Sequence, residues 1–111
     1  MKCLAILFCV FSLVMCAFTH SYKPKAGYVP DAETAVHVAE AVLIPVYGKK
    51  QIESERPFTA KLKHGVWTIA GTLRCPDGKG GFAPDSLCDG GVAVIQISKD
   101  DAHVVSMTHG K

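Results

Sequence analysis

The segment RPFTAKLKHGVWTIAGTL, residues 56–73, decides the fold because it holds two strand patterns on either side of a short turn. Apolar and polar residues alternate before His64 and Gly65, and the alternation resumes after them, which is typical of a β-hairpin. With these two residues as the loop, the large apolar side chains share one face, and Trp67 lies at the centre of the core. The pairs expected across the hairpin are Lys63 with Val66, Leu62 with Trp67, and Ala60 with Ile69.

A long amphipathic helix is predicted upstream of this hairpin. Asp31 is a suitable N-cap, because its carboxylate can accept hydrogen bonds from backbone N–H groups of the first turn. Pro45 and Gly48 are expected to end or kink the helix. The alanines of its apolar stripe indicate that the helix lies close against a sheet. This stripe consists of Ala32, Ala35, Val36, Ala39, Val42, Leu43 and Val46.

A second hairpin is expected where GVAVIQI (residues 91–97) and HVVSMTH (residues 103–109) flank the polar segment SKDDA. We expect a three-residue loop at 99–101, which fixes the register of the two strands. The helix-facing pairs in that register are Ile95 with Val105 and Ala93 with Met107. The predicted fold class is therefore α+β, with one long helix packed on a four-stranded antiparallel sheet.

The other face of this sheet is predicted to be uncharged at its centre. Such a face is commonly a solvated surface with good strand propensity, and it is also a candidate surface for a homodimer. Its members are expected to be Val66, Val92, Val94 and Val104 among Thr59, Thr68, Thr72, Ser106 and Thr108.

Residues 1–21, MKCLAILFCVFSLVMCAFTHS, have the layout of a secretory signal peptide, because Lys2 precedes a short apolar run. The run is shorter than the ~20 residues that a transmembrane helix needs. We therefore expect a single mature domain, residues 22–111, in the periplasm and without a membrane span. The segment LVMC loosely matches a lipoprotein box, so lipidation of Cys16 is the alternative to a soluble product that starts near Tyr22.

Length and charge limit the possible partners. The chain has 111 residues and a formal net charge of +2, which is compatible with one small globular domain. Removal of residues 1–21 takes away only one charged residue, Lys2, and leaves a nearly neutral domain. Attraction to nucleic acid or to membranes is therefore not expected.

The loop RCPDGKGGFAPDSLCDGG, residues 74–91, contains the two cysteines that the mature domain keeps, Cys75 and Cys88. An even pair in an exported small domain predicts a disulfide. The wide spacing and the lack of a nearby histidine argue against a zinc half-site or a catalytic thiol. Such a bond either stabilises the folded domain or fixes the loop in a conformation suited to a partner. The partner-binding candidates are Lys79, Phe82, Asp85 and Leu87.

Catalytic, metal and cofactor sites are not predicted. The helix-facing strand positions include no carboxylate, and they are expected to form a filled core. GKGG at 78–81 lacks the spacing of a phosphate-binding loop. Four histidines are interpreted as surface or turn residues, namely His37, His64, His103 and His109.

Two long segments resemble a known family. VPDAETAVHVAEAVLIPVYGKKQIESERPFTAKLKHGVWTIAGTL and GGVAVIQISKDDAHVVSMTHGK are similar to the NTF2-fold immunity proteins found beside bacterial polymorphic toxins. The resemblance implies an NTF2-like, cystatin-like fold and a protein that neutralises a cognate bacterial toxin by binding it, not an enzyme. The Cys75 to Cys88 segment departs from the family pattern as an insertion, so contacts made by other members do not transfer to it directly.

Two other function classes stay open at this point. A periplasmic cystatin-like inhibitor or scaffold protein would use the same loop and sheet edge against a different partner. A small NTF2-like ligand-binding enzyme would instead need a polar-lined cavity.

Overall fold

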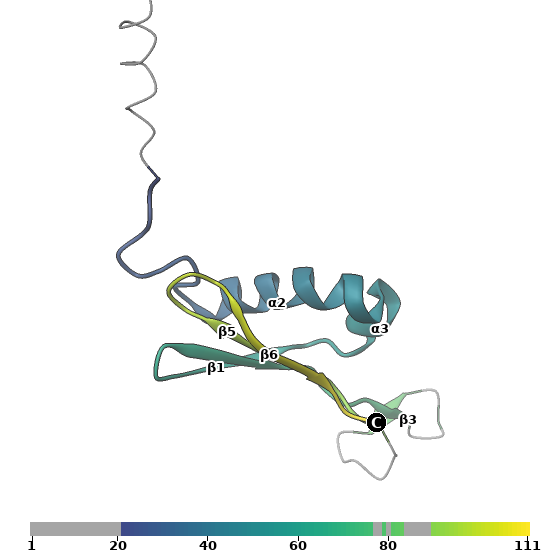
Figure 1. Ribbon diagram of the computed structural model, residues 1–111. Coiled ribbons are helices and arrows are strands. Elements are labelled where there is room, and N and C mark those ends of the chain that lie inside the picture. Colours follow the sequence, from purple (N-terminus) through teal and green to yellow (C-terminus); the bar gives the residue numbers. More distant parts are fainter. Residues whose placement is uncertain (1–20, 77–78, 80, 84–89) are drawn as a thin grey trace, which may run out of the picture.

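Two helices pack on one face of a four-stranded antiparallel sheet (Figure 1). The computed structural model describes residues 21–76, 79, 81–83 and 90–111, and the predicted signal segment lies outside it except for Ser21. None of the helices in these ranges is long and apolar enough to cross a membrane. In chain order the elements are α2 (Ala32–Tyr47), α3 (Lys49–Ser54), β1 (Thr59–Lys63), β2 (Val66–Ala70), β3 (Cys75–Pro76), β4 (Phe82–Ala83), β5 (Ala93–Ser98) and β6 (Val104–His109). The main sheet has four antiparallel strands, as the fold class predicted, and their order is β1-β2-β5-β6.

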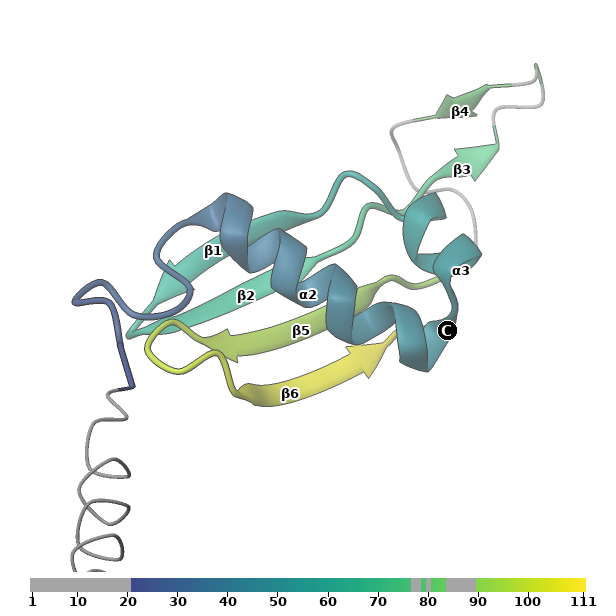
Figure 2. The same ribbon diagram turned by 90° about the horizontal axis from the view of Figure 1, so that it is seen from above.

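Helix α2 begins as the sequence predicts. The carboxylate of Asp31 accepts a 2.8 Å hydrogen bond from the backbone N–H of Thr34, and this bond lowers the pKa of Asp31. The helix continues through Pro45 and ends at Gly48, whose φ of 92° lies in the left-handed region that glycine tolerates. Small buried side chains, Ala35 and Ala39, let α2 lie close to the sheet, and Figure 2 shows from above how the helix runs across the strands.

The first hairpin has the predicted register. Leu62 pairs with Trp67 and Ala60 with Ile69. His64 and Gly65 have φ angles of 50° and 73°, the left-handed pair that a two-residue hairpin turn requires. The predicted central position of Trp67 is confirmed, because its side chain is only 7% exposed.

The predicted register of the second hairpin is wrong by two residues. Met107, not Val105, pairs with Ile95, and His109, not Met107, pairs with Ala93. Val105 is 49% exposed instead of lying in the core.

The connection between β5 and β6 explains this shift. The backbone N–H of Ala102 donates to the carbonyl of Ser98, which makes a four-residue loop instead of the expected three. A β-bulge follows, because Ile97 pairs with Val104 while the preceding Gln96 pairs with Ser106. Val104 therefore lies opposite the buried Ile97, and not on the sheet face away from the helix where it was predicted.

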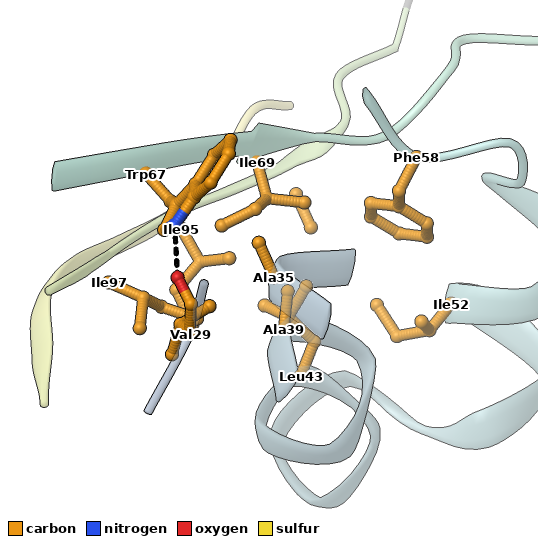
Figure 3. Close-up of a cluster of buried hydrophobic side chains, with 11 residues drawn as sticks. Val29, Ala35, Ala39, Leu43, Ile52, Phe58, Trp67, Ile69, Ile95 and Ile97 are labelled. Atoms are coloured by element: carbon orange, nitrogen blue, oxygen red, sulfur yellow. Dashed lines mark hydrogen bonds between the residues drawn. The ribbon is translucent and has the colours of Figure 1, made fainter. Parts of the chain in front are cut away.

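The core fills the space between α2 and the sheet (Figure 3). The indole N–H of Trp67 donates a 2.8 Å hydrogen bond to the carbonyl oxygen of Val29, so the segment before α2 closes one end of the core. Val29 itself is held by a backbone bond to Lys99 in the β5–β6 loop. The buried apolar cluster comprises Val29, Ala35, Ala39, Leu43, Ile52, Phe58, Trp67, Ile69, Ala93, Ile95 and Ile97.

The connection from β2 to β5 contains the short strands β3 and β4. They pair with each other as a separate two-stranded sheet, with Cys75 opposite Ala83. Figure 2 shows this unit beyond the end of the main sheet, on the side where α3 lies. It is an addition to the four-stranded sheet and leaves the main register undisturbed.

Candidate functional site

The predicted loop site lies only partly within the described residues. Cys75 is buried at the start of β3, and Lys79 is exposed. Phe82 belongs to β4, where its backbone pairs with that of Pro76. The other predicted residues, Asp85, Leu87 and Cys88, lie outside the described residues. The disulfide and the partner-binding role of the loop therefore stay predictions.

A buried carboxylate is the most unusual polar feature of the described chain. Glu55 follows α3 directly and is 3% exposed. Its Oε1 accepts a 2.6 Å bond from the backbone N–H of Ala93 in β5. Its Oε2 accepts a 3.2 Å bond from the amide of Gln51 and lies 3.1 Å from Nε2 of His109 in β6. A buried charge needs several such donors to offset the loss of its hydration.

The main chain holds Glu55 in the same place. The carbonyl of Glu55 accepts a 2.7 Å bond from the N–H of Thr72, which follows β2. Gly71 provides the space for the side chain, because a Cβ atom there would approach Oε1 of Glu55 to 3.0 Å. Glu55 thus connects α3 to the ends of β2, β5 and β6, where four separate parts of the chain meet.

His109 uses both of its ring nitrogens within the protein. Nε2 faces the carboxylate of Glu55, and Nδ1 lies 2.7 Å from the carbonyl oxygen of Gly110. Both partners are oxygens that can accept, so each ring nitrogen has an acceptor within hydrogen-bond distance. The ring of Tyr47 packs beside the imidazole, with centroids 5.0 Å apart. These contacts fasten the end of β6 to the helical layer.

The structure corrects one expectation here. His109 is not a surface residue, since its side chain is 22% exposed and paired with Glu55. The strand pattern did not indicate the buried carboxylate of Glu55, because this residue follows α3 and lies outside the strands. The strand alternation that places Met107 on the helix-facing side also places His109 there. The alternation alone could therefore have indicated that His109 is not a surface residue.

The other three histidines agree with the sequence interpretation. His64 occupies the turn between β1 and β2, and His37 is exposed on α2. His103 hydrogen-bonds to Asp101 in the exposed β5–β6 loop and lowers the pKa of that carboxyl to about 2. No group of three potential metal-ligating side chains occurs among the residues that the structure describes.

A pocket of about 330 Å³ lies beside Glu55. Most of its lining residues are polar or charged, although the surface they expose to the pocket is about equally polar and apolar; polar groups facing a cavity are what the ligand-binding alternative requires. Within the described chain, however, every buried side-chain nitrogen and oxygen has a hydrogen-bond partner. The pocket is lined by Gln51, Glu53, Ser54, Glu55, Thr72, Leu73, Arg74 and Gly91.

One ion pair joins α2 to the segment before β1. Arg56 donates two 2.8 Å hydrogen bonds to Glu40, one to each carboxylate oxygen. The guanidinium lowers the pKa of the Glu40 carboxyl. The backbone carbonyl of Arg56 in turn accepts a 2.9 Å bond from Nε of Arg74. The wall of the pocket is therefore held by charge-assisted contacts.

The sheet face opposite the helices carries a second polar arrangement. Lys61, Thr68, Gln96 and Ser106 form one row across all four strands, as the strand pairing shows. The Gln96 amide donates to the Thr68 hydroxyl at 3.3 Å, and the Ser106 hydroxyl donates to the Gln96 carbonyl oxygen at 2.9 Å.

The comparisons with known proteins agree with this architecture. The NTF2 fold immunity protein family matches residues 34–111, which include most of α2 and the whole sheet. The chain is also 28% identical over 83 residues to the uncharacterized protein YhhH of Escherichia coli (strain K12), a match that covers 75% of this chain and 58% of that protein. The chain therefore spans little more than half the length of this relative, and no solved structure matches it significantly. On the family match, the chain belongs to the NTF2 fold immunity proteins.

Proposed function

We propose that this protein is an exported immunity protein that neutralises a cognate bacterial toxin by binding it. The observation that carries the proposal is the family match over residues 34–111. It spans most of α2, the whole sheet and the Glu55–His109 contact, so most of the folded unit shares the family pattern. Immunity in this sense requires a stable complementary surface and no chemical turnover.

The Glu55 cluster supports a binding protein over an enzyme. A general base needs an acceptor directed at a substrate proton. Both oxygens of Glu55 already accept from protein donors, and both nitrogens of His109 face protein acceptors. The pair therefore serves to fix the ends of the strands, and the proposed activity lies on the surface of the domain.

The compartment is part of the proposal. Residues 1–21 have the layout of a signal peptide, and the predicted Cys75–Cys88 disulfide requires an oxidising environment. We therefore place the protein in the periplasm, where the target would be a toxin that acts on peptidoglycan, lipid or the inner membrane. Lipidation at Cys16 would tether the same domain to a membrane without changing its binding surface.

A protection assay tests the function and the compartment together. The toxin encoded beside the gene is directed to the periplasm of a sensitive host, with the full-length protein, a version lacking residues 1–21, or an empty vector. We expect survival only with the full-length protein, provided that both forms accumulate to equal levels. Full protection by the unexported form would contradict the periplasmic assignment. Lack of protection by either form would contradict the immunity function.

A further inference from the structure

The sheet face opposite the helices, called the outer face below, is open in the described structure. Figure 1 shows α2 and α3 on one side of the sheet and no described helix on the other. Alternation along each strand assigns the residues of this face. They are Thr59, Lys61 and Lys63 in β1, Val66, Thr68 and Ala70 in β2, Val94, Gln96 and Ser98 in β5, and Ser106 and Thr108 in β6.

The centre of the outer face is ordered before any partner arrives. Gln96 uses its amide nitrogen on Thr68 and its amide oxygen on Ser106, so side chains from three neighbouring strands hold one another. A surface whose side chains are already fixed loses less conformational entropy on binding than a mobile one. Val66, Ala70 and Val94 add apolar area around this row. Mixed polar and apolar composition is usual for protein interfaces.

The charge of the outer face has one sign. Lys61 and Lys63 are exposed and point to the same side of β1, about 7 Å apart along the strand. Among the described residues neither lysine takes part in an ion pair, and within these four strands no carboxylate shares their face. The described carboxylates lie instead on or beside the two helices and in the β5–β6 loop.

We infer that the outer face is the surface that contacts the toxin, with Lys61 and Lys63 directed at an acidic patch on it. The inference rests on the proposed immunity function. Complementary charge speeds the encounter of two proteins and disfavours wrong partners. The ordered row around Gln96 and the flanking valines then form the close contact.

A second copy of this chain fits the outer face less well. Two copies stacked face to face would bring four lysines and no outer-face carboxylate of the described strands into one interface, which like-charge repulsion opposes. The occupant is therefore a different protein with negative charge.

Charge reversal tests the inference. The probe is the purified toxin domain encoded beside the gene, and its binding to the full chain is measured by interferometry at low and at physiological salt. We expect Lys61→Glu/Lys63→Glu to weaken binding about tenfold or more, mainly through slower association at low salt. The matched control, Lys49→Glu/Lys50→Glu, reverses two exposed lysines of α3 on the opposite layer. It should change the affinity by less than about twofold, because it keeps the outer face intact.

Each other outcome contradicts the inference in a distinct way. Equal weakening by both double variants would show that only net charge matters. Unchanged binding of Lys61→Glu/Lys63→Glu would show that the lysines only protect the β1 edge from other sheets. A wild-type dimer, seen by light scattering and abolished by Lys61→Glu/Lys63→Glu, would assign the face to a second copy. Toxin that fails to bind even the wild-type protein would overturn the immunity function as well as this surface.

Discussion

Substitution of Glu55 by alanine should destabilise the domain more than a typical single substitution. The change removes the acceptor of three hydrogen bonds that come from Gln51, Ala93 and His109. The backbone N–H of Ala93 is fully buried, so it would lose its partner without gaining water. A buried donor left in this way costs about 1–3 kcal/mol.

The total effect follows from the three contacts. The bonds from Gln51 and His109 are partly buried, and we assign about 1 kcal/mol to each. The sum is about 3–5 kcal/mol. In a domain of this size such a loss lowers the melting temperature by more than about 12 °C.

A glutamine at the same position separates hydrogen bonding from charge. Its carbonyl oxygen can still accept from Ala93, and its amide group can still face Nε2 of His109. Glu55→Gln should therefore retain more than half of the stability that Glu55→Ala loses. Urea unfolding of the wild-type protein, both variants and His109→Ala would measure the differences. Equal stability of wild type and Glu55→Ala would refute the view that this cluster holds the strand ends together.

Three further predictions concern the core, the β5–β6 loop and the cysteine loop. Trp67→Ala should cost about 3–5 kcal/mol in chemical unfolding, because it opens a large cavity in the core; an unchanged unfolding midpoint would contradict the core assignment. NMR titration of the Asp101 carboxyl should give a pKa of about 2, below its ordinary 3.8, because of its bonds to His103. The wild-type protein should therefore be more stable than Asp101→Asn above about pH 4, and this difference in stability should disappear as the pH falls to about 2. If the cysteine loop contacts the toxin, Phe82→Ala combined with Asp85→Ala should weaken toxin binding about tenfold with little change in melting temperature. A lower melting temperature with intact binding would show that the loop only stabilises the domain.

The first hairpin could be predicted because its turn fixes its register. A two-residue loop of His64 and Gly65 leaves one pairing that puts every large apolar side chain on one face. The cap at Asp31 was predictable for a similar reason, since capping depends on residues close in sequence. Local chemistry therefore determined these parts of the fold.

The second hairpin depends on features that residue patterns do not indicate. Ala102 adopts a φ of 65°, although alanine has no preference for the left-handed region. The longer loop shifts the pairing by one residue and the bulge at Val105 by one more, so every later pair differs by two residues from the expected register. Alternation alone gave the correct face for Met107 but not its partner.

The Glu55 cluster could not be predicted from local sequence because its partners lie far apart. Ala93 is 38 residues away along the chain and His109 is 54. Most residues around Glu55 are polar, which is typical of an exposed segment, yet the tertiary fold buries this carboxylate. The same holds for Val29, whose carbonyl meets an indole 38 residues later.

Stoichiometric inhibition of the toxin tests the central claim most directly. The purified toxin domain would be assayed against its substrate while the full chain is added in increments, at toxin concentrations well above the dissociation constant. Binding predicts a linear loss of activity that ends at one protein per toxin, with recovery of activity when the complex is dissociated. Inactivation at far lower ratios, or a covalently altered toxin after dissociation, would show that the protein acts as an enzyme. Full toxin activity at saturating protein would contradict the immunity function itself.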